Sequence, residues 1–318
     1  MIISASYKTD IPAFYGEWFG NRLRAGFCKM ANPYNRNQRS TISLRREDVD
    51  GFVFWTKNVA PFMGVLDEVH KRGFPFIVQH TINGYPRALE SRVVDAGRSI
   101  DHLRTVAQKF GGRAAIWRYD TIVFSTITDA AFHRRNFAEL ASRLAGATDE
   151  VIVSFMQLYD KTQRNMDEAA RRDGFEWQDP PAETKRALLA DLAEIAANHE
   201  MHLTICTQPD LVVTGVGEAR CVDGPRLMEV AGRPFRSQLK GMRAGCGCFE
   251  SKDIGDYDTC PHGCVYCYAV RRRDVALRRY QGHDPESEYL FPQGSEPPEP
   301  EPPERGKRSQ LSLFPEDR

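Results

Sequence analysis

The sequence lacks several features that would indicate a function at once. Lys plus Arg and Asp plus Glu each number 43, so no global basic field points to nucleic acid. No apolar run is long enough to span a membrane. The first six residues are too short and polar for a secretion signal, so we expect a cytoplasmic protein without a membrane partner. The 318 residues contain no repeats and suffice for one barrel-sized domain with additions.

Seven of the eight cysteines lie in the C-terminal part of the chain, from Cys206 onward. Cys260, Cys264 and Cys267 have the spacing C-x3-C-x2-C. Three thiols so spaced can bind three corners of one iron–sulfur cube, which leaves the fourth iron free to bind something other than protein. A structural zinc ion with His262 or another cysteine as fourth ligand is an alternative. Disulfide bonds are a weaker alternative in a reducing cytoplasm.

A second set of four cysteines lies upstream, with the spacing C-x14-C-x24-C-x-C: Cys206, Cys221, Cys246 and Cys248. Four thiols can saturate a second iron–sulfur cluster or a zinc ion, and Gly245 and Gly247 would let the backbone turn closely around a metal. Unliganded or redox-pairing thiols are the alternative. The remaining cysteine, Cys28, is interpreted as a core residue of the first helical unit.

Apolar patterns along the chain predict alternating strands and helices. The strands are expected at residues 1–5, 51–56, 74–81, 114–124, 150–157 and 202–206, and the helices at 11–24, 61–71, 94–110, 129–145 and 184–199. Six strands separated by helices of crossover length favour an α/β fold with a parallel sheet. A (β/α)6 partial TIM-like barrel fits best, and a doubly wound open sheet is the alternative.

Polar residues gather where the predicted strands end, which is where either architecture places its functional groups. They are Ser6, Lys8, Thr9, Asp10, Thr56, Lys57, Asn58, His80, Thr81, Arg118, Asp120, Gln157, Tyr159 and Cys206. Helix caps or turns explain Thr9, Asp10 and Asn58 equally well. Lys57 and Arg118 end or interrupt apolar strands, where a buried cation requires a partner. These two are the candidate catalytic residues, suited to a carboxylate, a ribose or a phosphate.

The cysteine triplet, with Tyr266 before its last cysteine, resembles the signature of radical S-adenosylmethionine (radical SAM) enzymes. The string Cys-x3-Cys-Val-Tyr-Cys-Tyr-Ala is most similar to the spore photoproduct lyase branch. The resemblance implies a [4Fe-4S] cluster whose open iron binds SAM, an external electron donor, and reduction that yields a 5′-deoxyadenosyl radical. It also implies that Tyr266 packs near the adenine and that Thr56, Lys57 and Arg118 contact SAM.

A wider resemblance covers most of the chain. The opening Ile-Ile-Ser-Ala-Ser-x-Lys-Thr-Asp, the string Phe-Trp-Thr-Lys-Asn and the closing Cys-Gly-Cys-x4-Asp-Ile-Gly-x-Tyr-Asp-Thr-Cys are similar to a bacterial family called domain of unknown function 1848. That family brings no established reaction. In radical SAM enzymes the triplet usually follows the first barrel strand, whereas here it follows six. Either the barrel is circularly permuted, or a C-terminal extension folds back over its mouth. No glycine-rich motif for the SAM amine is found.

The chain is expected to divide into a barrel-like core at residues 1–206, a cysteine-rich region at 207–283 and a Pro/Glu-rich, disordered tail at 284–318. The tail ends in an apolar island that resembles the peptide by which bacterial replication and repair proteins bind the sliding clamp of DNA polymerase. Gln310 would make the polar contact, and Leu313 and Phe314, together with Leu311, the apolar ones.

These features predict a radical SAM enzyme that acts on nucleic acid, in DNA repair or nucleotide modification. The lyase likeness and the tail both point to DNA. The basic stretch at residues 271–279 could meet a nucleic-acid backbone, although a solvated helix face is the favoured interpretation. The alternatives are a radical SAM enzyme on a small molecule or peptide, and a non-catalytic zinc or iron–sulfur module recruited to DNA.

Overall fold

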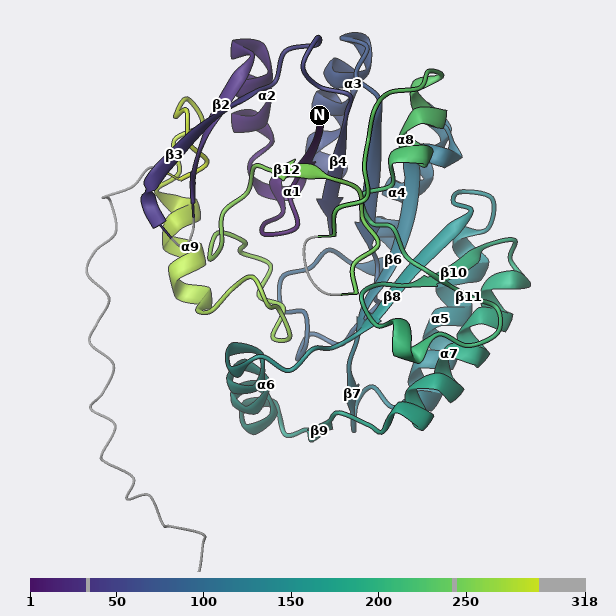
Figure 1. The fold of residues 1–318 in the computed structure, drawn as a ribbon. Coiled ribbons are helices and arrows are strands. Elements are labelled where there is room, and N and C mark those ends of the chain that lie inside the picture. Colours follow the sequence, from purple (N-terminus) through teal and green to yellow (C-terminus); the bar gives the residue numbers. More distant parts are fainter. Residues whose placement is uncertain (33–34, 242–244, 292–318) are drawn as a thin grey trace, which may run out of the picture.

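The computed structural model describes residues 1–32, 35–241 and 245–291 and is built around a parallel sheet of eight strands (Figure 1). The spatial order is β11-β10-β8-β6-β5-β4-β1-β12. The strands are β1 (Ile2–Ala5), β4 (Gly51–Thr56), β5 (Phe76–Thr81), β6 (Ala115–Ile122), β8 (Glu150–Phe155), β10 (His202–Ile205), β11 (Val216–Glu218) and β12 (Ser251–Asp253). All neighbouring pairs in this sheet are parallel.

The predicted α/β class is confirmed, and each of the six predicted strands is present. From β1 to β11 the spatial order follows the chain order, unlike a doubly wound sheet, whose order reverses at a switch point. Within the described residues the two edge strands, β11 and β12, do not pair with each other, so the sheet is open. These two strands were not predicted, because three residues are too few for a periodic pattern.

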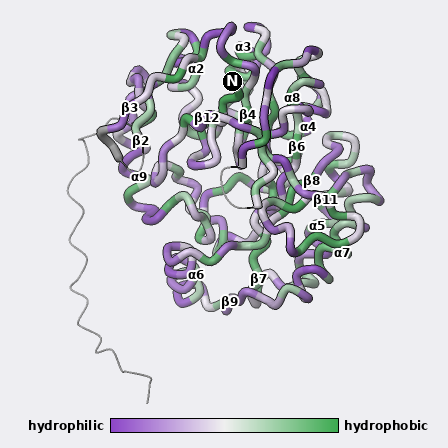
Figure 2. The backbone as a smooth tube through the Cα atoms, in the orientation of Figure 1, coloured by the Kyte–Doolittle hydropathy of each residue, from purple (hydrophilic) through white to green (hydrophobic). Residues whose placement is uncertain are grey.

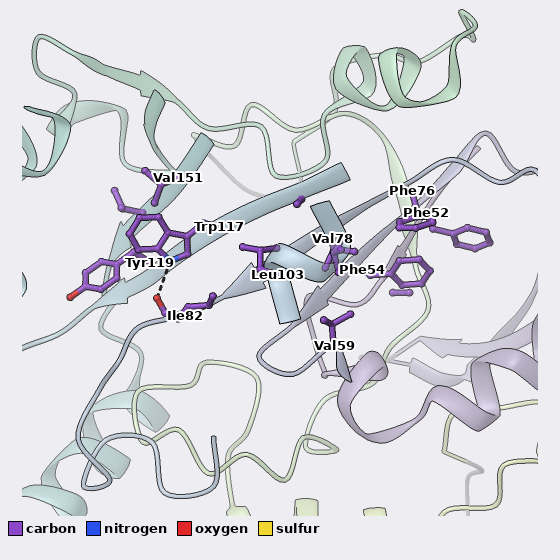
Figure 3. Close-up of a cluster of buried hydrophobic side chains, with 14 of the residues drawn as sticks. Phe52, Phe54, Val59, Phe76, Val78, Ile82, Leu103, Trp117, Tyr119 and Val151 are labelled. Carbon is purple, nitrogen blue, oxygen red and sulfur yellow. Dashed lines mark hydrogen bonds between the residues drawn. The ribbon is translucent and has the colours of Figure 1, made fainter. Parts of the chain in front are cut away.

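Five helices cover one face of the sheet: α2 (Gly16–Ala25), α3 (Met63–Lys71), α4 (Ala96–Phe110), α5 (Ala130–Leu144) and α7 (Ala182–Ala197). The core under them is rich in aromatic side chains, and Trp117 donates a hydrogen bond of 3.0 Å from Nε1 to the carbonyl of Ile82 (Figure 3). Asp95 and Asp129 cap α4 and α5, each worth about 1 kcal/mol. Hydrophobic residues concentrate in the strands, and the outlying α6 (Asp160–Asp173) is largely hydrophilic (Figure 2).

The other face of the sheet, called the inner face, carries the alternate residues of the strands. It begins with an apolar row that packs against Cys206, Cys221, Cys248 and Leu227: Ile2, Val53, Ile77, Ile116 and Ile152. Towards the carboxyl ends of the strands the same face becomes polar. Val53 is followed by Trp55 and Lys57, and Ile116 by Arg118 and Asp120. This gradient places the charged groups at the carboxyl edge, where parallel sheets carry their sites.

The remaining elements lie around this framework. They are α1 (Ile11–Phe14), the antiparallel hairpin β2 (Phe27–Asn32) and β3 (Asn35–Ser43), the pair β7 (Phe124–Ser125) and β9 (Trp177–Gln178), α8 (Gly224–Ala231), α9 (Arg273–Gln281), and 3₁₀ turns at Ala60–Phe62, Gly112–Ala114 and Pro209–Leu211. The assignment of Cys28 to a helical unit was wrong, because Cys28 lies on β2. It is fully buried, as expected of a core residue.

The disordered tail was predicted to begin near Asp284, but residues 284–291 lie on the folded core. The Ser287 carbonyl accepts a hydrogen bond of 2.9 Å from Trp18 Nε1, the Lys29 amide donates to the Glu288 carbonyl at 2.8 Å, and Leu290 is buried. Hydrogen bonds to its carbonyl groups and one apolar anchor therefore hold this stretch on the core. The predicted clamp-binding peptide, 310–314, lies outside the described residues. Among the described helices, none combines the length and apolar character that crossing a membrane requires.

Candidate functional site

The triplet of cysteines lies in the loop that follows β12, beside the carboxyl end of β1. Asp253, the last residue of β12, accepts hydrogen bonds of 2.8 Å from the hydroxyls of Ser4 and Ser6 and one of 3.0 Å from the Tyr7 amide. A Cβ on Gly255 would lie 1.9 Å from Ser6 Oγ. Only glycine therefore lets the loop pass so close to β1, and this approach brings the triplet to the carboxyl edge.

The triplet loop is paired with the segment between β5 and α4. The Val265 amide donates to the Leu89 carbonyl and the Arg92 amide to the His262 carbonyl, each at 3.1 Å. Gly263 has φ +73°, and a Cβ there would lie 2.6 Å from Ser91 Oγ. The turn between the first two cysteines of the triplet therefore requires glycine on two counts.

A buried polar network lies beside Cys264. Lys57 Nζ is 2.8 Å from Glu90 Oε1 and 3.2 Å from the Tyr266 hydroxyl, which also donates to Glu90. Asn83 Nδ2 donates to both acceptors, at 3.1 and 3.0 Å. Side-chain exposure is only 13% for Lys57 and 4% for Glu90. The predicted requirement of Lys57 for a partner is thus confirmed, and the partner is Glu90.

Glu90 and Asn83 were missed by sequence reasoning. Asn83 lies two residues beyond the end of β5, and Glu90 lies further along an irregular segment with no periodic pattern. The only available signal was that a buried Lys57 must have an acidic partner somewhere. Sequence alone cannot say which of the 43 acidic residues meets it.

The cation of Lys57 influences the thiols. Burial alone lowers the pKa of Lys57, but the Glu90 carboxylate and the nearby Cys264 raise it above its ordinary value. Conversely, burial raises the pKa of Cys264, and the Lys57 ammonium opposes that rise. Lys57 therefore stays charged and reduces, without reversing, the rise in the pKa of Cys264, so a metal would still have to displace the thiol proton.

The first cysteine of the triplet lies near Asp10. Asp10 caps α1 and accepts hydrogen bonds of 2.7 Å from the Lys57 amide and from His262 Nε2. Burial raises the pKa of Cys260, and Asp10, Cys267 and Cys264 raise it further through their negative charge. The three thiols therefore lie within electrostatic range of one another. With Nε2 engaged by Asp10, His262 would have to offer Nδ1 to a zinc ion.

The second set of four cysteines is also brought together. Cys206 and Cys221 have sulfur atoms 3.4 Å apart, Cys221 makes a thiol contact with Cys248, and Cys248 makes one with Cys246. The Val222 amide donates to Cys248 Sγ at 3.4 Å. In residues 1–32, 35–241 and 245–291, no three His, Cys, Asp or Glu side chains already stand in the geometry of a metal ion's ligands.

Arg118 lies beside the second set of cysteines. Its guanidinium donates to Cys221 Sγ at 3.1 Å and to Gln79 Oε1 at 3.2 Å, pairs with Asp120 at 2.6 Å, and covers the Trp55 ring. Burial lowers the pKa of Arg118, but Cys221 and Asp120 raise it, so the cation persists. Its contact with SAM stays a prediction.

The other residues predicted for the site differ in what their side chains contact. Thr56 Oγ1 accepts from the Asn58 amide at 2.8 Å and so shapes the turn, which leaves its SAM contact a prediction. Gln157 and Tyr159 bond to each other at 2.8 Å. His80 is fully buried, and burial lowers its pKa to about 3, so it is neutral at physiological pH.

A cavity of about 130 Å³ adjoins the Lys57 network and is lined in part by Thr81, Asn83, Arg87, Glu90 and Asp95. It is smaller than the roughly 300–1,000 Å³ of typical ligand pockets. It can therefore take only part of a cofactor such as SAM.

The basic stretch at 271–279 forms most of α9. Asp274 pairs with Arg272 at 2.7 Å and with Arg278 at 2.9 Å, while Arg279 turns inward to the Tyr257 carbonyl. Asp274 offsets only one of the five Arg charges of this stretch, so 271–279 keeps a net charge of +4, and both interpretations of it stay predictions.

Comparisons with known proteins give one informative match. The model of a family described as "Domain of unknown function (DUF1848)" matches residues 2–269. A search of curated proteins finds no match. A solved structure titled "Crystal structure of D-hydantoinase" is 11% identical and covers 61% of this chain and 37% of its own, with a TM-score of 0.27. A likeness this weak supports no argument about fold or function.

Proposed function

The chain belongs to the family of domain of unknown function 1848, and we propose that it is a radical SAM enzyme with an iron–sulfur cluster on Cys260, Cys264 and Cys267. The observation that carries the proposal is the position of these thiols. They follow an edge strand at the carboxyl end of a parallel sheet, beside the cation of Lys57. A catalytic cluster with one open iron requires three thiols at such a site.

The strand order supports a circularly permuted partial barrel of the radical SAM type. In that superfamily the triplet follows the first strand of the barrel. Here β12 pairs in parallel with β1 at the edge of the sheet, and the triplet loop follows β12 directly. In space, β12 therefore takes the place of a first strand although it comes last in the chain. This arrangement accounts for a triplet that the sequence carries so late.

The donor set fits the proposed cluster. Three thiols come from one loop, each keeps some exposed surface, and they lie within electrostatic range of one another, although among the described residues they do not already stand in the geometry of metal ligands. When bound, a cluster of this type supplies an electron that cleaves SAM. The protein's own groups have separate tasks. Lys57 offsets the negative charge of the thiolates, Glu90 and Asn83 hold Lys57 and Tyr266 in place, and Asp253 fixes the loop against β1.

The proposed substrate is nucleic acid. Support comes from the likeness to spore photoproduct lyase and from the clamp-binding-like sequence at 310–314. The stretch 271–279, with five Arg and one Asp, keeps a net positive charge and is compatible with this substrate. A small-molecule or peptide substrate remains the alternative within the same enzyme class.

The proposal is tested by anaerobic reconstitution with iron and sulfide. We expect about four irons per chain, an EPR signal of the reduced protein that changes when SAM is added, and formation of 5′-deoxyadenosine. Cys264→Ser should lose all three, while the matched Cys28→Ala, which removes a buried cysteine on β2, should keep them. Absence of iron uptake in the wild type, or a cluster indifferent to SAM, would sink the proposal.

A further inference from the structure

We infer that Cys206, Cys221, Cys246 and Cys248 bind a single tetrahedral metal ion of the zinc class, in a structural site separate from the triplet. The inference does not rest on the proposed function, because other thiols carry it and the ion takes no part in the reaction. Three observations support it: the spacing of the sulfur atoms, the groups that surround them, and the segment of chain that they tie together.

Successive sulfur atoms of this set contact one another. Cys206 and Cys221 have sulfur atoms 3.4 Å apart, and further thiol contacts join Cys221 to Cys248 and Cys248 to Cys246. Four thiolates about 2.3 Å from one zinc ion lie about 3.8 Å from each other, by tetrahedral geometry. An iron–sulfur cube attaches each thiolate to a different iron atom, which spreads the sulfur atoms further apart. Contact between successive thiols therefore favours one ion over a cube.

The surroundings suit a negatively charged metal–thiolate centre. Four thiolates and one divalent cation carry a net charge of −2, which is costly to bury without nearby donors or cations. Arg118, only 4% exposed, donates to Cys221 Sγ at 3.1 Å, and the Val222 amide donates to Cys248 Sγ at 3.4 Å. Gln79 Nε2 holds the Cys221 carbonyl at 2.8 Å. Such donors around the ligands stabilise metal sites and fix their geometry.

The site would hold down a segment with little regular structure. Between Cys206 and Cys248 the described chain forms only a 3₁₀ turn, the three-residue β11 and the eight-residue α8, yet it covers the apolar row of the inner face. The four cysteines come from the end of β10, the stretch before α8 and the loop before β12. One ion would tie these three stretches together, as structural zinc sites do.

Metal binding would require a rearrangement of the thiols. The four thiols form a chain of contacts rather than a tetrahedron, and no ready-made ligand set exists among the described side chains. Cys206 and Cys246, at the two ends of this chain, would close around the ion. A disulfide between Cys206 and Cys221 is the competing use of the same contact.

The test is a metal count on the full-length protein, purified anaerobically from medium that contains zinc and iron. We expect about one tightly bound zinc per chain. Cys221→Ser and Cys248→Ser should lose it, while Cys264→Ser and Cys28→Ala should keep it. The inference would be overturned if the Cys221→Ser variant lost bound iron and sulfide instead of zinc. A metal-free protein whose mass shows a Cys206–Cys221 disulfide would also overturn it.

A second measurement covers the case in which those variants fail to fold. X-ray absorption at the zinc edge of the wild type should show four sulfur ligands at about 2.3 Å, and a shell rich in nitrogen or oxygen would refute the site. Failure of the proposed function is distinguishable, because it appears as missing iron uptake or a missing SAM effect while the zinc count stays unchanged.

Discussion

The two groups of cysteines share one sheet but occupy different environments. Cys260, Cys264 and Cys267 lie past the strand ends, keep some exposed surface, and have the charges of Lys57 and Asp10 beside them. The four-thiol set packs on the apolar row of the inner face, and its nearest cation is the buried Arg118. Cys206, Cys221 and Cys248 are thus enclosed, whereas Cys246, like the three thiols of the triplet, keeps some exposed surface.

The difference shows why counting and spacing of cysteines do not assign roles. The triplet has compact spacing and comes from a single loop, whereas the four-thiol set is drawn from distant points of the chain. What separates them physically is access. A site with an open coordination position needs room for a ligand, and a structural site needs a closed shell.

The largest effect should come from removing the metal of the four-thiol set. Cys221→Ser is expected to lower the free energy of unfolding by about 4–5 kcal/mol, and Tm by roughly 10 °C. The reason is that the metal would no longer link the stretches of chain between Cys206 and Cys248. Cys264→Ser should change it by less than about 1 kcal/mol, since its thiol lies in a partly exposed loop. Thermal unfolding of both variants beside Cys28→Ala measures this. Equal losses in the two variants would erase the distinction between a structural and a catalytic group.

A smaller effect is expected at the ion pair beside the triplet. Lys57→Met leaves the Glu90 carboxylate, 4% exposed, without its cation and should cost roughly 3 kcal/mol. The double variant Lys57→Met/Glu90→Gln should recover most of that loss, yet it should still fail to respond to SAM. Denaturant unfolding and EPR of the reconstituted proteins give the two readouts. A single variant as stable as the wild type would contradict the pairing.

Arg118 offers a way to perturb one group alone. Arg118→Lys keeps the charge but loses the planar fork that contacts Cys221 and Asp120 together. We expect zinc affinity to fall by about tenfold, as for other partners of metal ligands. Iron uptake by the triplet should not change. Competition with a zinc chelator measures the affinity, and a matching fall in bound iron would show that the two groups are not independent.

The smallest effect on the folded protein is expected from the tail. Leu313→Ala together with Phe314→Ala should abolish binding of the full chain to the sliding clamp while leaving both metal counts and Tm unchanged. Calorimetric titration against purified clamp measures the binding. Equal affinity of the wild type and the variant would remove the clamp as a partner.

Much of the framework could be predicted from sequence because it depends on local patterns. Six strands and their helices follow from runs of apolar residues, and the buried cation of Lys57 follows from its place at a strand end. The hairpin containing Cys28 and the short strands β11 and β12 could not be found this way. Three residues carry no periodicity, and β12 is defined by its partner β1 rather than by its own composition.

The types of residue in the site could be predicted from sequence, but not which residues contact each other there. The spacing of the triplet predicted a cluster. The position of Lys57 at the end of a strand correctly predicted that its side chain lies near the triplet. Glu90 and Asn83 could not be predicted as site residues, because they lie in an irregular segment whose path is set by contacts with the triplet loop. Asp253 connects the end of β12 to Ser4 and Ser6, a pairing across the chain that no local pattern indicates.

The pairing of β12 with β1 has a consequence for biosynthesis. Ser4 and Asp253 are hydrogen-bonded although 249 residues separate them in the chain. On the ribosome β1 emerges among the first residues, and its outer edge stays unpaired until nearly all of the ordered chain has been made. An unpaired edge invites wrong association during that interval. The three cysteines that follow β12 emerge later still, so the proposed cluster would be inserted only after all eight strands of the sheet have been synthesised.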